Sequence, residues 1–490
     1  MSPRTTALAI IFAIVFAGSL IGFLAAKKKR PNLEEWAVAG RGFGLLFVWI
    51  LLAGETFTAF SVLGVSGWTY AKGGPVLYVL AYLTIGQLLV FYIGPPMWEA
   101  GRRYRLQTIS DFFGRRYGSD LLAAAVAVAG VLFLILYLQL QITSLGIIVG
   151  FASLEAIGRT PAMVAATILV AGFVLVSGVR GVAWVSVLKD FLLVALAVVV
   201  GFGIPYLRFG GLGPMYSEVN RTHPGFLTLP GATTNYGHLW YVTTVLVNAL
   251  VFAWPHFYGA LFTAKDADTV RRNAILMPLY VIPLALIMFA GTAAILLVPG
   301  LKNGDLALLA VVREVFPPWV LGLIGGAGAL TAMVPASIHI LTASTLFTKN
   351  VYRPYVDPGM SDARMVLLAR FLVFVVAAVA LYLALHSSTT LVGLLMLAYS
   401  GVGQFAPGLV LGIYCPRINA AGVLAGLAAG LGVTGVLVFA HLDPWHGLNA
   451  GFVGLSVNVP LTVLVSLLTP ARPSGILWEP APPAGAGSGR

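Results

Sequence analysis

One pattern repeats along almost the whole chain: an apolar stretch of about 20 residues followed by a short separator rich in Gly, Pro or charge. A helix of that length spans the hydrocarbon core of a bilayer. Only 9% of the 490 residues are Asp, Glu, Lys or Arg, against about 25% in a soluble domain. We therefore predict an all-α polytopic membrane protein embedded in a lipid bilayer. About thirteen transmembrane helices are expected, at residues 6–26, 43–70, 75–98, 121–150, 161–179, 184–207, 239–263, 274–299, 317–347, 364–385, 389–414, 418–440 and 449–469.

The basic residues predict how these spans are oriented. The first span is followed directly by residues 27–30, all Lys or Arg, so its basic flank is on the wrong side for a cleaved signal peptide. With the N-terminus outside and alternating sides from there, 22 of the 29 Lys and Arg residues fall in or near the cytoplasm. The net charge of +12 then reflects topology, and we expect no nucleic-acid partner. The predicted location is the inner (plasma) membrane, with a cytoplasmic C-terminus.

The remaining composition excludes most catalytic classes. A single transmembrane domain is expected over residues 1–470, and the Pro-, Gly- and Ala-rich residues 471–490 are expected to form a disordered cytoplasmic tail. The single Cys415 excludes an intramolecular disulfide and any multi-cysteine metal site. The sequence contains no P-loop, HExxH, dinucleotide-binding glycine turn or GxSxG motif. We expect neither an enzyme nor an organic cofactor, which leaves secondary transport of a small molecule.

Two spans carry signals of an interrupted helix. The second has Gly54 at its midpoint, followed by Glu55, Thr56 and Thr58, and the seventh has Pro255 between Trp254 and His256. Broken membrane helices occur where they line a cavity, and transporters place them at matching positions in two inverted repeats. These two lie five helices apart. This spacing predicts a five-plus-five, leucine-transporter-like core with repeats at about 43–207 and 239–414, plus one N-terminal and two C-terminal helices.

Two ionisable residues inside spans stand out. Glu55 is the only carboxylate far from both ends of a span, and it either serves transport or caps the helix break as a neutral group. Lys189 lies roughly 8 Å inside the sixth span at 1.5 Å per residue, and it either snorkels to the headgroups or points into the bundle towards Glu55. Asp190 is turned about 100° away and is expected at the interface.

Other polar residues give weaker signals. His256 beside the break donates to a substrate carboxylate or to a freed backbone carbonyl, whereas His339 is expected to be a core histidine with satisfied nitrogens. Gln139 and Gln141 face different directions, and spacing alone does not choose between them.

Several stretches resemble the sodium/solute symporter family. They are residues 36–44 before the second helix, Tyr137 with Gln141 in the fourth, Pro255-His256 with the charged turn at 265–272 after the seventh, and residues 344–353 at the end of the ninth. This resemblance favours Gln141 over Gln139. Residues 55–60 and 328–336 look most like the bacterial monocarboxylate permease branch. The resemblance implies import of a small solute by alternating access, with a monocarboxylate or small amino acid as substrate. It also implies substrate contacts at Thr56, Thr58, Gln141, Trp254 and His256.

The chain departs from the family at the expected ion site. Members that use sodium hold it with second-helix carbonyls, here nearest Gly54 and Phe57, and with ninth-helix positions that correspond to Thr331, Val334 and Pro335. Two of those ninth-helix hydroxyls are therefore missing. Only a weak sodium site is expected, formed by the carbonyls of Gly54 and Phe57 together with Thr331 or Ser337.

Lys189 falls near that site, where the family usually has an uncharged polar residue. We hypothesise that its ammonium replaces the sodium ion, paired with Glu55, so that the coupling ion is H⁺ rather than Na⁺. A sodium-coupled symporter is the first alternative. A transporter-derived sensor is the second, disfavoured because the chain ends about twenty residues after its last helix.

Overall fold

The computed structural model describes residues 2–26, 39–153, 157–232, 235–387 and 389–470. Within these ranges the protein is helical and has only two isolated β-bridges. The residues predicted to form the cytoplasmic tail, the basic run at 27–30 and residues 36–38 of the 36–44 stretch lie outside the described residues. The main helices are α1 (Pro3–Ala26), α3 (Leu45–Thr56), α4 (Val65–Lys72), α5 (Tyr78–Arg103), α6 (Ile109–Tyr117), α7 (Asp120–Ala152), α8 (Arg159–Phe209), α9 (Leu212–Thr222), α10 (His238–Asn248), α11 (Pro255–Leu261), α12 (Ala267–Leu276), α13 (Val281–Leu297), α14 (Ala307–Val315), α15 (Pro318–Phe347), α16 (Arg353–Tyr355), α17 (Asp362–His386), α18 (Leu391–Val402), α19 (Ala406–Tyr414), α20 (Ala420–Phe439) and α21 (Ala450–Leu468).

Ten helices in the described part of the chain are long and apolar enough to cross a membrane, or eleven if α3 and α4 count as one bent span. The protein is therefore a multi-pass membrane protein. The difference between these eleven spans and the predicted thirteen arises in two places. The 51-residue α8 covers two predicted spans, and α10 and α11 are each too short to qualify alone. The count of thirteen stays a prediction.

The long helix α8 is broken at a glycine. At 1.5 Å per residue its 51 residues would extend about 75 Å, more than twice a bilayer's hydrocarbon core. Gly178, with φ 54° and ψ −168°, interrupts the helical geometry near the boundary expected between the fifth and sixth spans. Residues with a side chain rarely adopt this conformation, so glycine is needed at this position.

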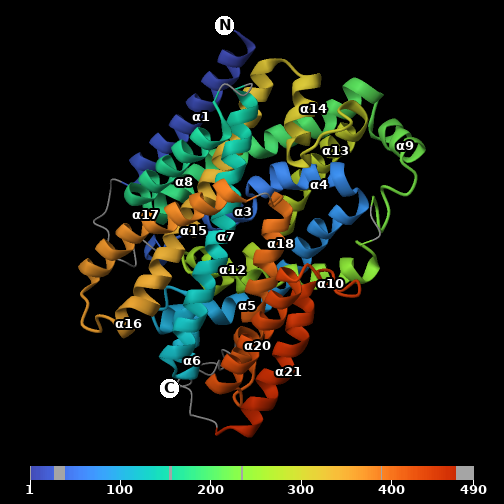
Figure 1. The fold of residues 1–490 in the computed structure, drawn as a ribbon. Helices are drawn as coiled ribbons and strands as arrows, with labels where there is room; N and C mark the ends of the chain where they lie inside the picture. The colour runs from blue at the N-terminus through green and yellow to red at the C-terminus, as the bar shows by residue number, and fades with distance from the viewer. Residues whose placement is uncertain (1, 27–38, 154–156, 233–234, 388, 471–490) are drawn as a thin grey trace, which may run out of the picture.

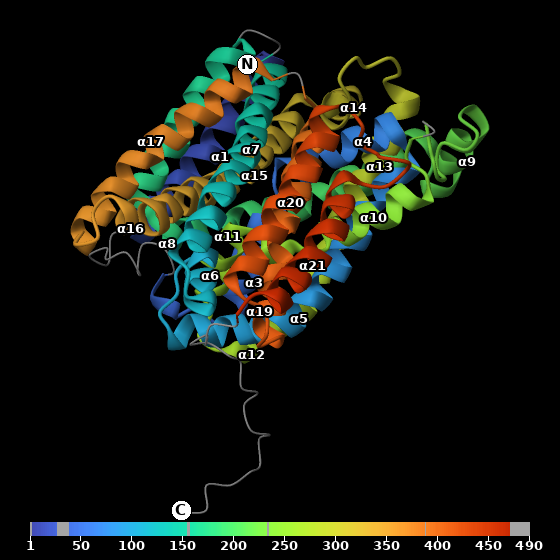
Figure 2. The same ribbon diagram turned by 60° about the horizontal axis from the view of Figure 1, so that its bottom comes forward.

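The bundle is built around α15, which is buried almost throughout. It packs against α1, α7 and α8, while α20 and α21 lie side by side and pack on each other (Figures 1 and 2). Small residues allow the close approach of α15 to α1: a Cβ on Gly322 would meet the backbone of Ala7 at 3.0 Å.

Several helices begin at side-chain caps. Thr108 and Asp111 form a reciprocal capping box at the start of α6, and Asp266, Thr390 and Asn419 cap α12, α18 and α20. The short helices α6, α9 and α14 lie between the apolar spans, where the sequence indicated only connections.

Candidate functional site

The first helix break lies at the position indicated by Gly54. α3 ends at Thr56, Phe57 has the non-helical angles φ −86° and ψ 89°, and a π-turn over Phe60–Gly64 leads into α4. The two halves are bent by 59°. Carbonyl groups at such a helix end have no partner in their own helix, so they are free to bind a cation or a donor.

Lys189 of α8 occupies this break. Its Nζ donates hydrogen bonds to the carbonyls of Gly54 at 2.7 Å and Phe57 at 2.9 Å, and its side chain is 0% exposed. These are the two carbonyls expected to bind sodium. A Cβ at Gly54 would lie 2.7 Å from Ser186 Oγ, so glycine is needed for the close approach of α3 to α8. Lys189 therefore points into the bundle and does not snorkel.

The carboxylate paired with Lys189 is Asp190, not Glu55. The distance from Lys189 Nζ to Asp190 Oδ1 is 3.0 Å, and the Asp190 side chain is only 6% exposed. The expectation that Asp190 lies at the interface is therefore wrong. Tyr280 donates to Asp190 Oδ2 at 3.3 Å. The ammonium thus donates to two carbonyls and forms an ion pair with a carboxylate, in the place where an ion would need oxygen ligands.

The second helix break lies at Pro255, as the sequence indicated. α10 ends at Asn248, a short 3₁₀ turn covers Val251–Ala253, and Trp254 is extended with φ −67° and ψ 129° immediately before Pro255. Proline disfavours helical geometry in the residue before it, which explains the extended Trp254.

The two breaks meet at a buried cavity of about 40 Å³. Four residues proposed from the sequence line it: Glu55, Thr56, Trp254 and His256. Four further residues with polar groups line it, Gln87 of α5, Tyr137 of α7, Asn273 of α12 and Tyr399 of α18, and the rest of the lining is apolar. Of these, only Tyr137 had a sequence signal, through its spacing to Gln141.

Unpaired polar atoms surround this cavity. Among the described residues, Glu55 Oε1, Gln87 Oε1, Asn273 Oδ1 and His256 Nδ1 are buried and have no hydrogen-bond partner. Leaving buried polar groups unpaired costs about 1–3 kcal/mol each, so several of them around one cavity indicate a site for a polar ligand.

Aromatic rings close one wall of the site. The Tyr137 ring lies 5.0 Å from that of Trp254, 5.8 Å from that of His256 and 4.3 Å from that of His339. His339 is buried as expected, but neither of its ring nitrogens has a hydrogen-bond partner among the described residues. The prediction of a satisfied histidine was therefore wrong.

The other proposed residues lie beside the cavity lining rather than in it. Gln141 Oε1 accepts a hydrogen bond from the Ala59 amide at 3.3 Å, and Thr58 Oγ1 accepts one from the Phe60 amide at 3.2 Å. Both side chains therefore stabilise the first break. Thr331 and Ser337 donate to carbonyls of their own helix, at 2.7 and 2.8 Å. No group of three or more His, Cys, Asp or Glu residues that could hold a metal ion occurs in the described ranges.

Comparison with known proteins identifies the family. The model of the sodium:solute symporter family matches residues 36–430, most of the chain. The chain belongs to this family. It is 39% identical to the uncharacterized symporter YhjB of Bacillus subtilis (strain 168), over 94% of this chain and 97% of that protein. It is 29% identical to a monocarboxylate transport permease protein of Rhizobium johnstonii, over 95% of this chain and 98% of the permease.

The fold agrees with this assignment. A Na⁺-coupled sialic acid symporter in a substrate-bound, outward-open state superimposes with a TM-score of 0.78 at 18% identity, covering 95% of this chain and 98% of that one. The family and its structural neighbours are transporters rather than enzymes. The resemblance seen in the sequence is confirmed.

Proposed function

We propose that this protein is a proton-coupled symporter that imports a small organic solute across the inner membrane by alternating access. The observation that carries the proposal is the position of Lys189. Its ammonium donates to the carbonyls of Gly54 and Phe57 and pairs with Asp190, all within 3.0 Å. A fixed positive charge at these oxygens competes directly with a sodium ion.

The proposed coupling follows from the charge of Lys189. Protonated Lys189 donates to two carbonyls and pairs with the Asp190 carboxylate, and it ties α8 to the end of α3. Deprotonated, it loses the positive charge that attracts these oxygens, and its hydrogen bonds to the carbonyls are no longer charge-assisted. The tie between the two helices is then weaker, so proton release favours movement of α3 relative to α8. Lys189 and Asp190 form a buried pair whose protons are expected to titrate jointly.

The architecture that fits this mechanism is the thirteen-helix, five-plus-five arrangement. The breaks between α3 and α4 and between α10 and α11 support two repeats of opposite orientation, at about 43–207 and 239–414, within one domain over 1–470. In this arrangement the bend at Gly178 divides α8 into two spans, and the two halves of the seventh span together form one more. These two additions bring the eleven apolar spans to thirteen. The N-terminus is proposed to lie outside and the C-terminus in the cytoplasm.

The proposed substrate is a monocarboxylate, the class of compound for which the Rhizobium permease is named. In this proposal its carboxylate accepts hydrogen bonds from Trp254 and His256, whose Nε1 and Nδ1 are unpaired in the described residues. Thr56, whose hydroxyl donates to a backbone carbonyl of its own helix at 2.9 Å, contacts the substrate from the same cavity wall. Thr58 and Gln141 act by holding the first break in shape.

A small zwitterionic amino acid is the second candidate substrate. It is favoured by the unpaired oxygens of Glu55, Gln87 and Asn273 at the cavity, because an ammonium group supplies the donors that these acceptors lack.

Counterflow with purified protein distinguishes the two substrate classes. Labelled pyruvate, lactate, alanine and proline would each be offered to liposomes preloaded with the same unlabelled compound. Exchange of pyruvate and lactate supports the first class. Exchange of alanine or proline without exchange of pyruvate or lactate supports the second class, provided that this exchange is lost in the Glu55→Gln variant. Exchange of none of the four contradicts both.

A further inference from the structure

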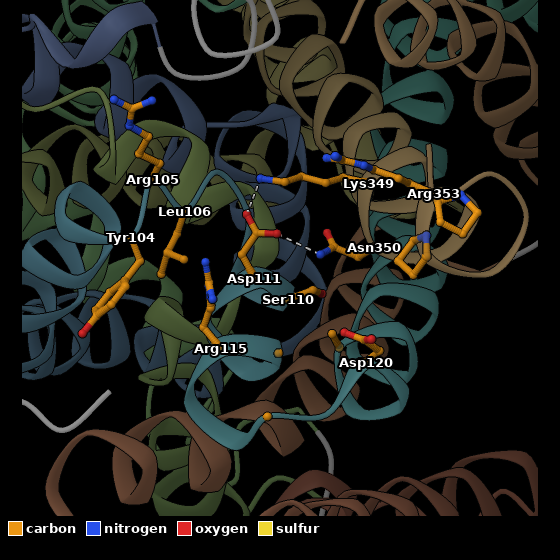
Figure 3. A pocket seen from close by; sticks show the side chains of 15 residues that line it. Tyr104, Arg105, Leu106, Ser110, Asp111, Arg115, Asp120, Lys349, Asn350 and Arg353 are labelled. Atoms are coloured by element: carbon orange, nitrogen blue, oxygen red, sulfur yellow. Dashed lines mark hydrogen bonds and ion pairs between the residues drawn. The ribbon is translucent and has the colours of Figure 1, made fainter. Parts of the chain in front are cut away.

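A second and much larger cavity, of about 610 Å³, lies at the α6 end of the molecule. It is formed by the loop before α6, by α6 itself, by the start of α7, and by the turn and α16 that follow α15 (Figure 3). None of its lining residues lines the cavity at the helix breaks. The transport mechanism described above makes no use of it.

The lining of this cavity carries an excess of positive charge. Four basic residues line it, Arg105, Arg115, Lys349 and Arg353, against the acidic Asp111 and Asp120. Arg353 follows Lys349 by four residues, on the stretch that continues α15.

Asp111 is already fully engaged. It accepts hydrogen bonds from Lys349 at 2.8 Å, from Asn350 at 2.9 Å, and from the backbone amides of Gln107 and Thr108 at 2.7 and 3.0 Å. Figure 3 shows the first two contacts as they reach Asp111 from the α15 side. This network fixes one wall of the cavity, and its carboxylate does not neutralise the arginines.

Three guanidinium groups are left without an ion-pair partner among the described residues: those of Arg105, Arg115 and Arg353. Ser110, which also lines the cavity, is 0% exposed, and its Oγ has no hydrogen-bond partner in the described ranges. Topology explains why basic residues lie at this end of the molecule, but it does not explain why they gather with an unpaired buried hydroxyl around one cavity.

We propose that this cavity binds a phosphate-bearing anion. A guanidinium group presents paired N–H donors that match two phosphate oxygens, and a serine hydroxyl adds a neutral donor. Because the cavity joins α6 to the end of α15, a bound anion fixes these two elements to each other. The phosphate is supplied either by the headgroup of an anionic lipid or by a soluble phosphate compound.

A charge-matched pair of double variants tests this site. Arg115→Gln with Arg353→Gln removes two guanidinium groups from the cavity. Arg102→Gln with Arg103→Gln removes two exposed ones near the same end, which lie over the rings of Trp98 and Tyr104 and do not line the cavity. The full-length protein is used in all cases, and equal thermal unfolding midpoints without added anion verify that both variants fold.

The two sources of phosphate are tested in separate arms. In the first, pyrophosphate is titrated into protein in neutral detergent. In the second, thermal unfolding is compared in phosphatidylcholine nanodiscs with and without phosphatidylglycerol. We expect stabilisation of the wild type in at least one arm, with apparent affinity reduced by about tenfold or more in the cavity variant and unchanged in the control.

The arm that responds identifies the source. A stabilisation that falls equally in both variants reflects the overall charge of that end of the protein and overturns the site. No stabilisation of the wild type in either arm also overturns it. If the Arg115→Gln, Arg353→Gln variant cannot be purified, the single variant Ser110→Ala is tested in its place. The proposal then requires that Ser110→Ala reduce the apparent affinity relative to the wild type by the same factor.

Discussion

At the scale of single residues, the most informative side chain is that of Lys189. Its proximity to the carbonyls of Gly54 and Phe57 was predictable, because the family resemblance located an ion site beside it. Its pairing with Asp190 was not. Neighbours in a helix are turned about 100° apart, but this describes the direction of their Cβ atoms only. Both side chains are flexible enough to bring Lys189 Nζ within 3.0 Å of Asp190 Oδ1.

Other site residues had no signal in a single sequence. Gln87 and Asn273 line the cavity, yet Gln87 is a lone amide in an apolar helix and Asn273 follows two arginines in a polar one. Polarity alone does not say which way such a side chain faces. Glu55 was identified because a carboxylate inside a span is rare, and the structure adds that one of its oxygens is unpaired.

The Asp111→Asn variant is expected to lose about 2 kcal/mol of stability at neutral pH, because it removes the ion pair with Lys349 and weakens several charge-assisted hydrogen bonds. Burial raises the pKa of the Asp111 carboxyl. Lys349 and the hydrogen bonds donated to the carboxylate together lower this pKa by more than burial raises it, so it lies below the usual range. The stability from ionised Asp111 is therefore fully present above the unfolded-state pKa of about 3.9 and is lost as pH falls through the lower folded-state value.

Thermal unfolding at several pH values measures this effect. The difference between wild type and Asp111→Asn should be constant from about pH 5 to 8 and should shrink below about pH 4. Asp120→Asn, at an exposed carboxylate of the same cavity, is the control and should differ little from wild type. A difference that grows as the pH falls would contradict this account of Asp111.

At the scale of elements, the two helix breaks were predictable because they have local causes. Pro255 removes a backbone donor, and Gly54 precedes a run of polar residues. The boundary within α8 was also located, at 179–184, but its geometry was not. The chain stays helical on both sides of Gly178 and turns at that residue alone. The helices α6, α9 and α14 were missed, since short polar helices between spans lack the long apolar pattern on which the prediction depended.

The Gly178→Ala variant should destabilise the protein by about 1–3 kcal/mol, because φ 54° with ψ −168° is essentially restricted to glycine. Gly172→Ala, six residues earlier in α8, is the matched control. A Cβ there meets no atom within 4 Å, so a neutral or slightly stabilising effect is expected. Chemical denaturation of both variants in detergent gives the comparison. Equal effects would mean that α8 can straighten at Gly178 without cost.

At the scale of the whole molecule, the asymmetry of basic residues predicts which loops face outward. In a Cys415→Ser background, a cysteine at exposed Lys302, in the loop between α13 and α14, should react with a membrane-impermeant maleimide in intact cells. A cysteine at exposed Arg103, at the end of α5, should react only after the membrane is permeabilised. Labelling in the reverse order would invert the proposed topology, and labelling of both in intact cells would rule out thirteen alternating spans.

The central claim is that Lys189 takes the place of the coupling ion, and uptake by the purified protein in proteoliposomes tests it most directly. We expect the wild type to accumulate substrate under an inward proton gradient without sodium. Lys189→Ala and Lys189→Arg should both lose accumulation and still fold, because arginine keeps the charge but does not release its proton. Accumulation that requires a sodium gradient and ignores the proton gradient, or that is unchanged in Lys189→Ala, would contradict the claim.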